Sequence, residues 1–515
     1  MINKNLEILD CTLRDGGYYT NWDFDDNLVE KYFSAMNKLP IDILEIGYRS
    51  RPQKEYMGKY FYFPQFVVDK IAKLNKGKRL ALMFNEKSVR PEHLDDLLKG
   101  LNPIISLIRL AVDPENLDRS VVLAKAIQER GFGVAFNVMY MSQYAENVEF
   151  LKKLCIVNGV VEYLNIVDSY GGLLPNQVTE LVKIIKANVD VKVGYHGHNN
   201  LELGLANTLA AMDAGCKIVD ATVLGMGRGA GNLKTELLLT HLASIGKADF
   251  DFNELSSLIE AWTPLHKEHE WGTNLPYMVS GANSLPQKDV MEWVTQRFYS
   301  FNSIIRALQN QKTGEADNMR LPVFKPEKSF KNVVIIGGGP NAKLHAEAVK
   351  HFVKKLHNVC LIHASSKNAK CYEDVNLDQY FCLVGNEGHR LEEVFNDLNH
   401  FRGQCVLPAF PRKMGTYIPE MLKEVAFELA KVTFTDKHLD SHTVLASQTA
   451  LELNAENVYL VGYDGYPKNV ITHKEQVLIN ENEYSFRMVG KKVLLKSILP
   501  SEYGIEVTSV YALTD

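Results

Sequence analysis

The sequence is poor in cysteine and has none of the close Cys-x-x-Cys pairs that form zinc knuckles or redox motifs. Its seven cysteines are odd in number and scattered through 515 residues, so we expect reduced core thiols and no disulfide framework. A run of about 18 apolar residues is also missing, and the N-terminus lacks the apolar stretch of a signal peptide. We therefore expect a cytoplasmic protein with no membrane partner.

The sequence also lacks an excess of positive charge. A formal net charge of −5 and a pI near 6.3 give no general attraction to a phosphate backbone, so nucleic acid is not an expected partner. With 46% hydrophobic and 23% charged residues, the composition is that of a globular chain with a large core. The length predicts at least two domains, and a homo-oligomer is compatible with the sequence.

The first half of the chain alternates short β-branched runs with longer amphipathic stretches, which is the pattern of repeated βα units. Eight units in about 240 residues match a closed (β/α)8 TIM barrel. An open doubly wound sheet is the alternative, but it usually has fewer strands and a GxGxxG loop, where this chain has CTLRDGG. The predicted strands are Leu6–Asp10, Ile43–Ile46, Arg79–Met83, Ile105–Leu110, Gly133–Asn137, Tyr163–Asp168, Val191–His196 and Ile218–Thr222.

The chain after residue 250 changes its pattern twice. We assign residues 1–250 to the barrel and residues 251–327, where helical periodicity ends in a polar stretch with glycine and two prolines, to a helical extension and linker. Residues 328–515 alternate again, with strand-like runs such as NVVIIGGGP and NVYLVGYDG and helical patterns such as Met421–Lys431. This part is predicted to be an open, Rossmann-like α/β domain.

Polar residues gather at the ends of the barrel strands, where TIM barrels carry their chemistry. His196 and His198 are two residues apart on one strand, so both imidazoles can project to the same face, roughly 7 Å apart. With Asp15 from the end of the first strand, they form a donor set that suits Mn²⁺, Zn²⁺ or Fe²⁺. Asn232 can add an amide oxygen. The alternatives are a hydrogen-bonded histidine pair, a loop-capping carboxylate and a turn asparagine.

These motifs carry a resemblance. LDCTLRDG at 9–16, Glu45, HGHNN at 196–200 and GMGRGAGN at 225–232 occur together and in order, and residues 7 to about 240 resemble the DRE-TIM metallolyase superfamily. Within it, the chain looks most like the 4-hydroxy-2-oxovalerate aldolases. The resemblance implies a divalent metal, with Mn²⁺ preferred over Mg²⁺, Zn²⁺ or Co²⁺, held by Asp15, His196, His198 and Asn232. It also implies that Arg14 faces a bound 2-oxo acid.

The expected reaction is the making or breaking of a carbon–carbon bond between pyruvate and an aldehyde. A metal chelated by pyruvate is a Lewis acid at the oxygen where negative charge grows, and Arg14 adds a second stabiliser there. Without the motif, Arg14 would be taken for an ordinary ion-paired residue. The same-site alternative is a Claisen-type acyl-CoA synthase or an HMG-CoA-lyase-like enzyme, and a non-catalytic binding scaffold is the third hypothesis.

The acid–base group departs from the family pattern. Pyruvate aldolases place a histidine three residues after the aspartate of RDG, and this chain has Tyr18, a poor base at neutral pH without help. Glu45 is the other catalytic candidate, because the lyase and synthase branches use a glutamate there. Asp168 and Gly229 are candidates for lining the substrate pocket, and both also suit tight turns. Weaker acid–base candidates are His266, His269, Tyr48 and Tyr277.

The second domain offers one further motif. Gly337, Gly338 and Gly339 follow a predicted strand and precede a helix, so their amides are candidates for a phosphate or nucleotide turn. The third glycine of GxGxxG is missing, and the next strand ends in HASS with no acidic residue for a ribose hydroxyl, which disfavours an NAD-linked dehydrogenase. The domain faintly resembles pterin diphosphokinase-like and sialyltransferase-like Rossmann folds. An inert module for assembly or regulation is the alternative.

Overall fold

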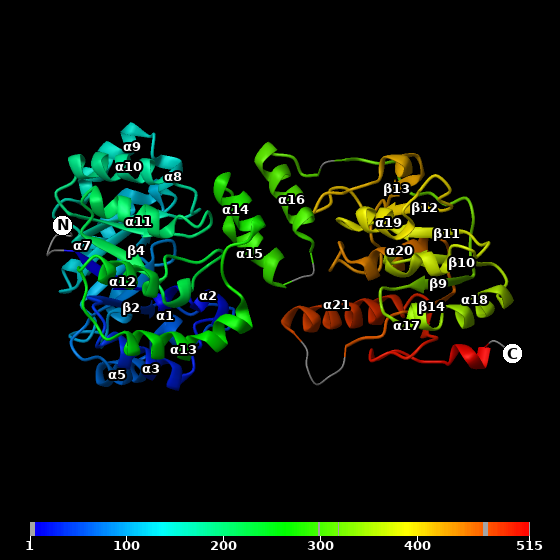
Figure 1. Ribbon diagram of the computed structural model, residues 1–515, viewed down its shortest axis with the longest axis horizontal. Coiled ribbons are helices and arrows are strands. Elements are labelled where there is room, and N and C mark those ends of the chain that lie inside the picture. The colour runs from blue at the N-terminus through cyan, green and yellow to red at the C-terminus, as the bar shows by residue number, and fades with distance from the viewer. Residues whose placement is uncertain (1–5, 297–298, 318, 467–471, 514–515) are drawn as a thin grey trace. The chain divides into compact units, whose positions relative to one another are not determined.

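Eight parallel strands close into a barrel in the computed structural model, which describes residues 6–296, 299–317, 319–466 and 472–513 (Figure 1). The strands are β1 (Glu7–Asp10), β2 (Ile43–Tyr48), β3 (Arg79–Asn85), β4 (Leu107–Val112), β5 (Gly133–Val138), β6 (Tyr163–Asp168), β7 (Lys192–Gly197) and β8 (Ile218–Ala221). Each end lies within two residues of the sequence prediction. The predicted TIM barrel is confirmed.

Helices surround the barrel (Figure 1). They are α1 (Thr12–Asp15), α2 (Gly17–Thr20), α3 (Asp26–Met36), α4 (Lys59–Tyr62), α5 (Gln65–Leu74), α6 (Leu94–Leu97), α7 (Leu117–Gln128), α8 (Met141–Tyr144), α9 (Val148–Lys153), α10 (Pro175–Asn188), α11 (Gly204–Asp213), α12 (Thr235–Ser244) and α13 (Phe252–His269), and α14 (Leu275–Ala282) and α15 (Gln287–Gln296) follow in the chain. Helix α10 illustrates the packing, because its buried residues Val178, Leu181, Val182 and Ile185 recur with helical spacing on one face.

Side chains fill the barrel interior at the amino-terminal part of the strands. One buried cluster joins residues from seven strands with Cys11, which directly follows β1: Leu9, Cys11, Ile43, Ala81, Leu107, Ala135, Tyr163 and Ile218. A packed layer of this kind leaves no channel through the barrel. The carboxyl ends of the strands therefore remain as the place for a site.

A second parallel sheet follows in the chain, with seven strands in the order β13-β12-β11-β10-β9-β14-β15. The strands are β9 (Asn332–Ile336), β10 (Val359–His363), β11 (Gln379–Cys382), β12 (Gln404–Leu407), β13 (Ala426–Glu428), β14 (Asn457–Val461) and β15 (Leu494–Ser497). The helices are α16 (Phe301–Thr313), α17 (Asn341–Leu344), α18 (Ala346–Lys355), α19 (Glu387–Phe395), α20 (His442–Glu452) and α21 (His473–Val489). The predicted C-terminal α/β domain with a parallel sheet is confirmed.

The helix predicted for Met421–Lys431 is wrong. Residues Glu420–Val425 form a 3-10 turn, and Ala426–Glu428 form β13, which pairs in parallel with β12. The segment VAFEL contains the strand-favouring Val425 and Phe427, and pairing with the neighbouring strand overrides the helical tendency of its Glu, Leu and Ala residues. Strand β13 is thus an edge strand of the second sheet that the helical pattern did not predict.

The chain divides into two compact units, Met1–Met291 and Glu292–Asp515. The division falls within α15, and helices α13 and α14 belong to the first unit. In the second unit, the Asp317 carboxylate accepts a hydrogen bond from Arg412 Nε at 2.7 Å, and the Phe324 amide donates to the Glu428 carbonyl at 2.8 Å. The polar stretch before β9 is therefore packed into that unit.

Two expectations from composition have a structural counterpart. All seven cysteines are free thiols. Five of them are buried, as expected, whereas Cys371 is partly exposed and Cys155 is exposed. Among the described helices, none is both long and apolar enough to cross a membrane.

Candidate functional site

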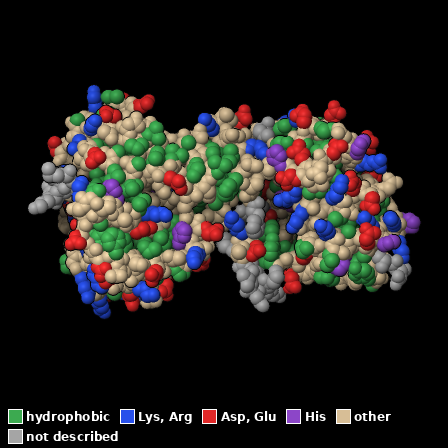
Figure 2. Space-filling model, in the orientation of Figure 1, with side chains coloured by type: hydrophobic (Ala, Val, Ile, Leu, Met, Phe, Trp, Pro, Cys, Tyr) green, Lys and Arg blue, Asp and Glu red, His purple; other side chains and the backbone are tan. Residues whose placement is uncertain are grey.

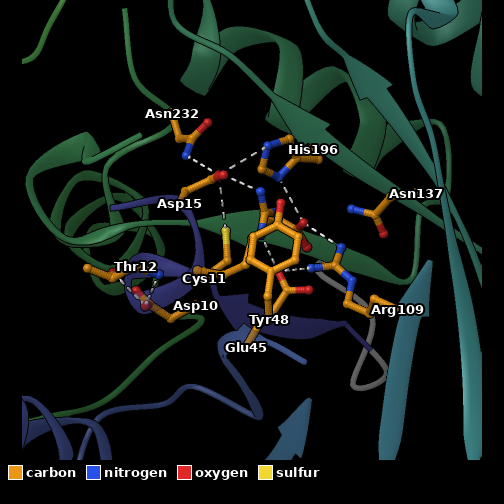
Figure 3. A network of polar contacts seen from close by, with 12 residues as sticks. Asp10, Cys11, Thr12, Asp15, Glu45, Tyr48, Arg109, Asn137, His196 and Asn232 are labelled. Atoms are coloured by element: carbon orange, nitrogen blue, oxygen red, sulfur yellow. Dashed lines mark hydrogen bonds and ion pairs between the residues drawn. The ribbon is translucent and has the colours of Figure 1, made fainter. Parts of the chain in front are cut away.

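A set of buried polar residues lies at the carboxyl ends of β1, β2, β7 and β8 (Figure 3). Arg14 and Asp15 come from the turn after β1, and Glu45 comes from β2. His196 and His198 come from the end of β7, where His198 forms an isolated bridge with Asn232 from the loop after β8. None of the six residues is more than 7% exposed. The structure therefore brings together residues that are far apart in the sequence.

Asp10 fixes the turn that presents Arg14 and Asp15. Its carboxylate accepts hydrogen bonds from the Thr12 amide at 3.0 Å and from the hydroxyls of Thr12, Tyr32 and Thr235, each at 2.6 Å. Burial raises the pKa of Asp10, and these donors lower it in part. Sequence reasoning assigned no role to Asp10, although a carboxylate that ends an apolar strand and precedes threonine was a usable signal.

Asp15 lies among three hydrogen-bonding or charged groups. Asn232 Nδ2 donates to Asp15 Oδ2 at 2.7 Å, Arg14 pairs with Oδ1, and His196 Nε2 lies 3.6 Å from Oδ2. Burial raises the pKa of Asp15, but Arg14 and the two histidines outweigh it and hold the pKa below its ordinary value. The carboxylate is therefore ionised at neutral pH and can serve as a ligand.

Both imidazoles are held through Nδ1. His198 Nδ1 lies 2.8 Å from the Asp168 carbonyl oxygen, which can only accept, so Nδ1 carries the proton and Nε2 carries a lone pair. His196 Nδ1 lies 2.9 Å from Asp220 Oδ2 and has the same tautomer. Burial, followed by the charge of His196, lowers the pKa of His198 to about 3. A neutral imidazole whose other nitrogen is held by an oxygen is the usual state of a metal-ligating histidine.

The donor set suits a divalent metal. Asn232 Oδ1 is buried and has no hydrogen-bond partner in the described part of the chain, so a ligand can satisfy it. With the Nε2 atoms of His196 and His198 and the carboxylate of Asp15, this set combines imidazole and oxygen donors, as Mn²⁺, Zn²⁺ and related ions prefer. These residues fit the metal that the sequence resemblance implies.

A second grouping competes for the same histidine. Ligand atoms of Cys11, His196 and Asp220 lie within 4.8 Å of one another. Asp220 Oδ2, however, accepts from both His196 Nδ1 and Arg109 at 2.6 Å, and burial raises the pKa of the Cys11 thiol well above its ordinary value. A protonated thiol is a weak ligand, and Asp220 holds His196 through Nδ1 whereas Asp15 lies beside Nε2, so we favour the Asp15 set.

Arg109 links the base of the site. It is fully buried and donates to Glu45 Oε2 at 2.9 Å and to Asp220 Oδ2 at 2.6 Å. Arg14 Nε donates to the same Glu45 oxygen at 2.8 Å, while the second terminal nitrogen of Arg14 is buried with no partner among the described residues. Two guanidinium groups thus donate to one Glu45 oxygen. Sequence reasoning missed Arg109. Its position as a single arginine inside the apolar run LIRLAV was the available signal.

Two tyrosines form the side of the site near β2. The hydroxyls of Tyr18 in α2 and Tyr48 in β2 lie 3.5 Å apart. Burial, followed by the charge of Tyr18, raises the pKa of Tyr48 well above its ordinary value, so Tyr48 is a proton donor and not a base. The guanidinium of Arg228 lies 5.7 Å from the Tyr18 ring centre. Gly229 accepts a hydrogen bond from Tyr19 through its carbonyl, at 3.1 Å.

The Asp168 side chain is engaged within its own loop. Its carboxylate accepts from the amides of Gly172 at 3.3 Å and Leu173 at 3.1 Å, and burial raises its pKa to about 6. Through its backbone carbonyl, the same residue holds His198. Asp168 therefore acts here as a positioning residue, and its proposed contact with substrate stays a prediction.

Residues of the helical extension lie beside the loop after β8. The nearest atoms to Gly229 include the Tyr277 ring, and the Tyr277 hydroxyl is buried without a partner among the described residues. The His269 ring lies 5.7 Å from that of Tyr19, whereas His266 Nε2 is engaged by the Trp271 carbonyl at 3.0 Å. Tyr277 is thus a stronger site candidate than the sequence indicated, and His266 is a weaker one.

Comparisons with known proteins agree with this architecture. The HMGL-like family model matches residues 108–261. Oxaloacetate decarboxylase from Mycobacterium tuberculosis is 26% identical over 321 residues, covering 60% of this chain and 92% of that protein. 4-Hydroxy-2-oxovalerate aldolase from Chloroflexus aggregans is 30% identical over 247 residues, covering 47% of this chain and 71% of that protein.

A solved structure is also similar to this chain. The crystal structure of the N-terminal domain of a putative aldolase from Bacteroides vulgatus is 54% identical, with a TM-score of 0.56, and covers 59% of this chain and 100% of that one. Together, fold and relatives define an enzyme of the aldolase and lyase type. The chain belongs to the HMGL-like family, which is the DRE-TIM family indicated by its motifs.

Proposed function

We propose that the barrel is a divalent-metal-dependent carbon–carbon lyase whose reaction passes through the enolate of pyruvate. The observation that carries this is the pair of imidazoles, each held through Nδ1 with Nε2 free, beside the ionised carboxylate of Asp15. A bound divalent metal would supply Lewis acidity at the keto oxygen. Mn²⁺ is the first metal for assay, with Zn²⁺, Co²⁺ and Mg²⁺ as comparisons.

The arginine beside that carboxylate is the second support. Arg14 has a buried terminal nitrogen without a partner among the described residues, so it can donate to an oxygen of the substrate. Glu45 holds the guanidinium in place through Nε at 2.8 Å. A fixed donor of this kind stabilises the negative charge that grows on the oxygen when the carbon–carbon bond breaks.

Cleavage of a 4-hydroxy-2-oxo acid requires a proton acceptor. When the 4-hydroxyl loses its proton, the C3–C4 bond breaks, an aldehyde leaves and the electron pair becomes the pyruvate enolate, which is then protonated at C3. We assign proton transfer to the hydroxyls of Tyr18 and Tyr48, which lie 3.5 Å apart. Tyr18 takes the 4-hydroxyl proton while it passes its own proton to solvent, and Tyr48 donates a proton to C3 of the enolate and regains one from solvent. We propose Glu45 as a support for Arg14 more than as a base. Asp168 and Gly229 complete the pocket wall through their loops.

A second candidate reaction is decarboxylation of oxaloacetate. There the C3–C4 bond breaks with loss of CO2, and no hydroxyl proton has to be removed. The tyrosine in place of a histidine base and the two guanidinium groups on Glu45 favour this reaction. The similarity to a protein named oxaloacetate decarboxylase, over 92% of its length, adds support. Acyl-CoA condensation shares the enolate but requires a second acyl substrate.

One set of assays separates these reactions. The purified protein is analysed for metal and then incubated with pyruvate in D2O, and exchange at C3 is followed by NMR. We expect metal-dependent exchange, followed by turnover of either a 4-hydroxy-2-oxo acid or oxaloacetate. Exchange that needs acyl-CoA would instead favour the condensing enzyme, and metal-free protein that neither exchanges nor turns over any substrate after metal addition would favour the binding scaffold.

A further inference from the structure

A cavity of about 1050 Å³ opens at the carboxyl edge of the second sheet. It lies where the loops after β9, β10, β11 and β14 meet, and β9 pairs with β10 on one side and with β14 on the other. Strands β10 to β13 follow one another on one side of β9, and β14 and β15 lie on its other side, so the strand order reverses at that point. Ligands of open parallel sheets bind in this crevice, and the volume is at the upper end of the range for small-molecule sites.

Two of the three glycine amides in the turn after β9 already have acceptors within the protein. The amide of Gly337 donates to the Val461 carbonyl at 2.7 Å, and that of Gly339 donates to the Gly462 carbonyl at 2.9 Å. The backbone amide of Asn341 donates to Asp464 Oδ2 at 2.9 Å. These N–H groups are therefore already bound by the loop after β14. Other groups in the cavity wall therefore have to bind an anion.

Positive charge enters the cavity from side chains and helix ends. Lys367 and Arg390 line it, and Lys367 makes no ion pair with any described residue. Helices α16, α19 and α20, of 13, 9 and 11 residues, all begin in its wall, and no side chain caps α20. Uncapped N–H groups at the start of a helix carry partial positive charge. The wall near His442 thus suits a negatively charged group.

Three carboxylates in the wall have hydrogen-bond or ion-pair partners of their own. Glu387 is 4% exposed and accepts from the Ser366 amide at 2.6 Å and from Arg390 at 3.0 Å, with His442 Nε2 at 3.4 Å. Tyr299 donates to Asp440, and His438 lies 3.5 Å from Glu481. None of these three acids is ion-paired with Lys367.

Asp464, also in the cavity wall, has one carboxylate oxygen without a hydrogen-bond partner in the described chain. Asp464 binds the Asn341 amide through Oδ2, while its Oδ1 is buried with no hydrogen-bond partner in the described chain. Burial raises the pKa of Asp464. An unsatisfied acceptor in a ligand crevice calls for a hydrogen-bond donor, and the hydroxyl of a sugar ring is a neutral donor of the right kind.

We propose that this cavity binds a phosphate ester of a sugar, as found in nucleotides and in sugar phosphates, with the phosphate near Lys367, Arg390 and the start of α20 and a ring hydroxyl donating to Asp464. Charge-assisted bonds fix the phosphate, and the carboxylate selects the sugar. The aromatic residues Tyr463, Tyr466 and Tyr503 in the wall offer surfaces for a base or sugar ring. This second site is independent of the barrel reaction.

Titration calorimetry of the full-length protein tests the site. The probes are nucleoside mono- and diphosphates, glucose 1-phosphate, inorganic phosphate and unphosphorylated nucleosides. We expect saturable binding of at least one phosphate ester, with inorganic phosphate weaker and nucleosides weaker still. No saturation by any ester at millimolar concentration, or equal affinity for a nucleoside and its phosphate, overturns the proposal.

Two variants separate the phosphate from the sugar contact. Lys367→Gln is expected to weaken every phosphate probe by about tenfold or more. Asp464→Asn is expected to weaken the sugar esters but to leave inorganic phosphate unchanged. Lys343→Gln, on α17 and outside the cavity wall, is the matched control and should bind like the parent. Equal affinities in Lys367→Gln and Lys343→Gln overturn the proposed phosphate position, and near-UV circular dichroism verifies the fold of each variant.

Discussion

The barrel and the second sheet both place polar groups at the carboxyl ends of parallel strands, but they treat charge differently. In the barrel, Asp15, Glu45 and Asp220 are each held by an arginine and are at most 2% exposed. In the second unit, Lys367 is exposed and makes no ion pair within the described chain. Fixed, buried charge suits chemistry, because it needs no reorganisation when the transition state forms. Exposed, unpaired charge suits reversible binding.

The largest expected effect in this comparison is the loss of a proposed metal ligand. Asp15→Asn or His198→Ala is expected to remove stoichiometric metal and reduce turnover to background, because both side chains lie at the barrel mouth outside its packed layer. Metal content by plasma mass spectrometry and the exchange assay measure this. His241→Ala, on α12, is the control and should keep its metal. A fully active His198→Ala protein without metal would contradict the proposal.

The next effect is on folding. Arg109→Met leaves Glu45 and Asp220 buried without their shared partner, so the free energy of unfolding of the barrel should fall by about 3–5 kcal/mol. Urea unfolding followed by circular dichroism gives the change. Arg79→Met, which removes a partly exposed ion pair with Glu162, should cost only about 0–1 kcal/mol. Equal losses in the two variants would show that the buried network is not a stabilising unit.

Arg14→Lys tests fixed charge more narrowly. The variant keeps the charge but loses the planar fork that contacts Glu45 and leaves a nitrogen for substrate, so we expect turnover to fall about tenfold or more, or about 1.4 kcal/mol. Steady-state kinetics at saturating metal measure the change. If kcat and KM are both unaltered, Arg14 has no part in the mechanism.

The second unit should respond to acid through His363. This residue is fully buried, its Nε2 lies 2.8 Å from Gln379 Oε1, and burial lowers its pKa to about 4. The unfolded chain binds a proton near pH 6.5, so the stability due to the neutral ring is complete above that pH and decreases as the pH falls toward 4. We expect His363→Phe to flatten this pH dependence in urea unfolding of the second unit. An unchanged slope would exclude His363 as its source.

Separation of the two units should have the smallest effect on barrel chemistry. Every proposed ligand lies in the first unit, and the solved structure of an N-terminal domain on its own matches 59% of this chain. A protein ending after α15 is therefore expected to bind metal and exchange pyruvate protons at the parent rate. If it folds and holds metal but does not exchange, the two units share a site and the proposed division of function is incorrect.

The sequence predicted the barrel and the residues at the carboxyl ends of its strands, because both depend on local sequence patterns. Strand ends followed from alternation, and the ligand candidates Asp15, His196 and His198 followed from motif and spacing. The Arg109 to Asp220 ion pair was missed because its two residues are 111 positions apart and each sits singly in an apolar strand. The glycine turn after β9 was interpreted as an anion site because the sequence does not show which acceptors its amides meet.

Asp10 gives the barrel a property that concerns engineering. Its carboxylate holds the turn after β1 through hydrogen bonds from Thr12, Tyr32 and Thr235, none of which lies in α2. A substitution at position 18 therefore leaves these hydrogen bonds to Asp10 in place. Position 18 is thus the natural starting point for a designed library of variants that keep Asp15 as the proposed ligand.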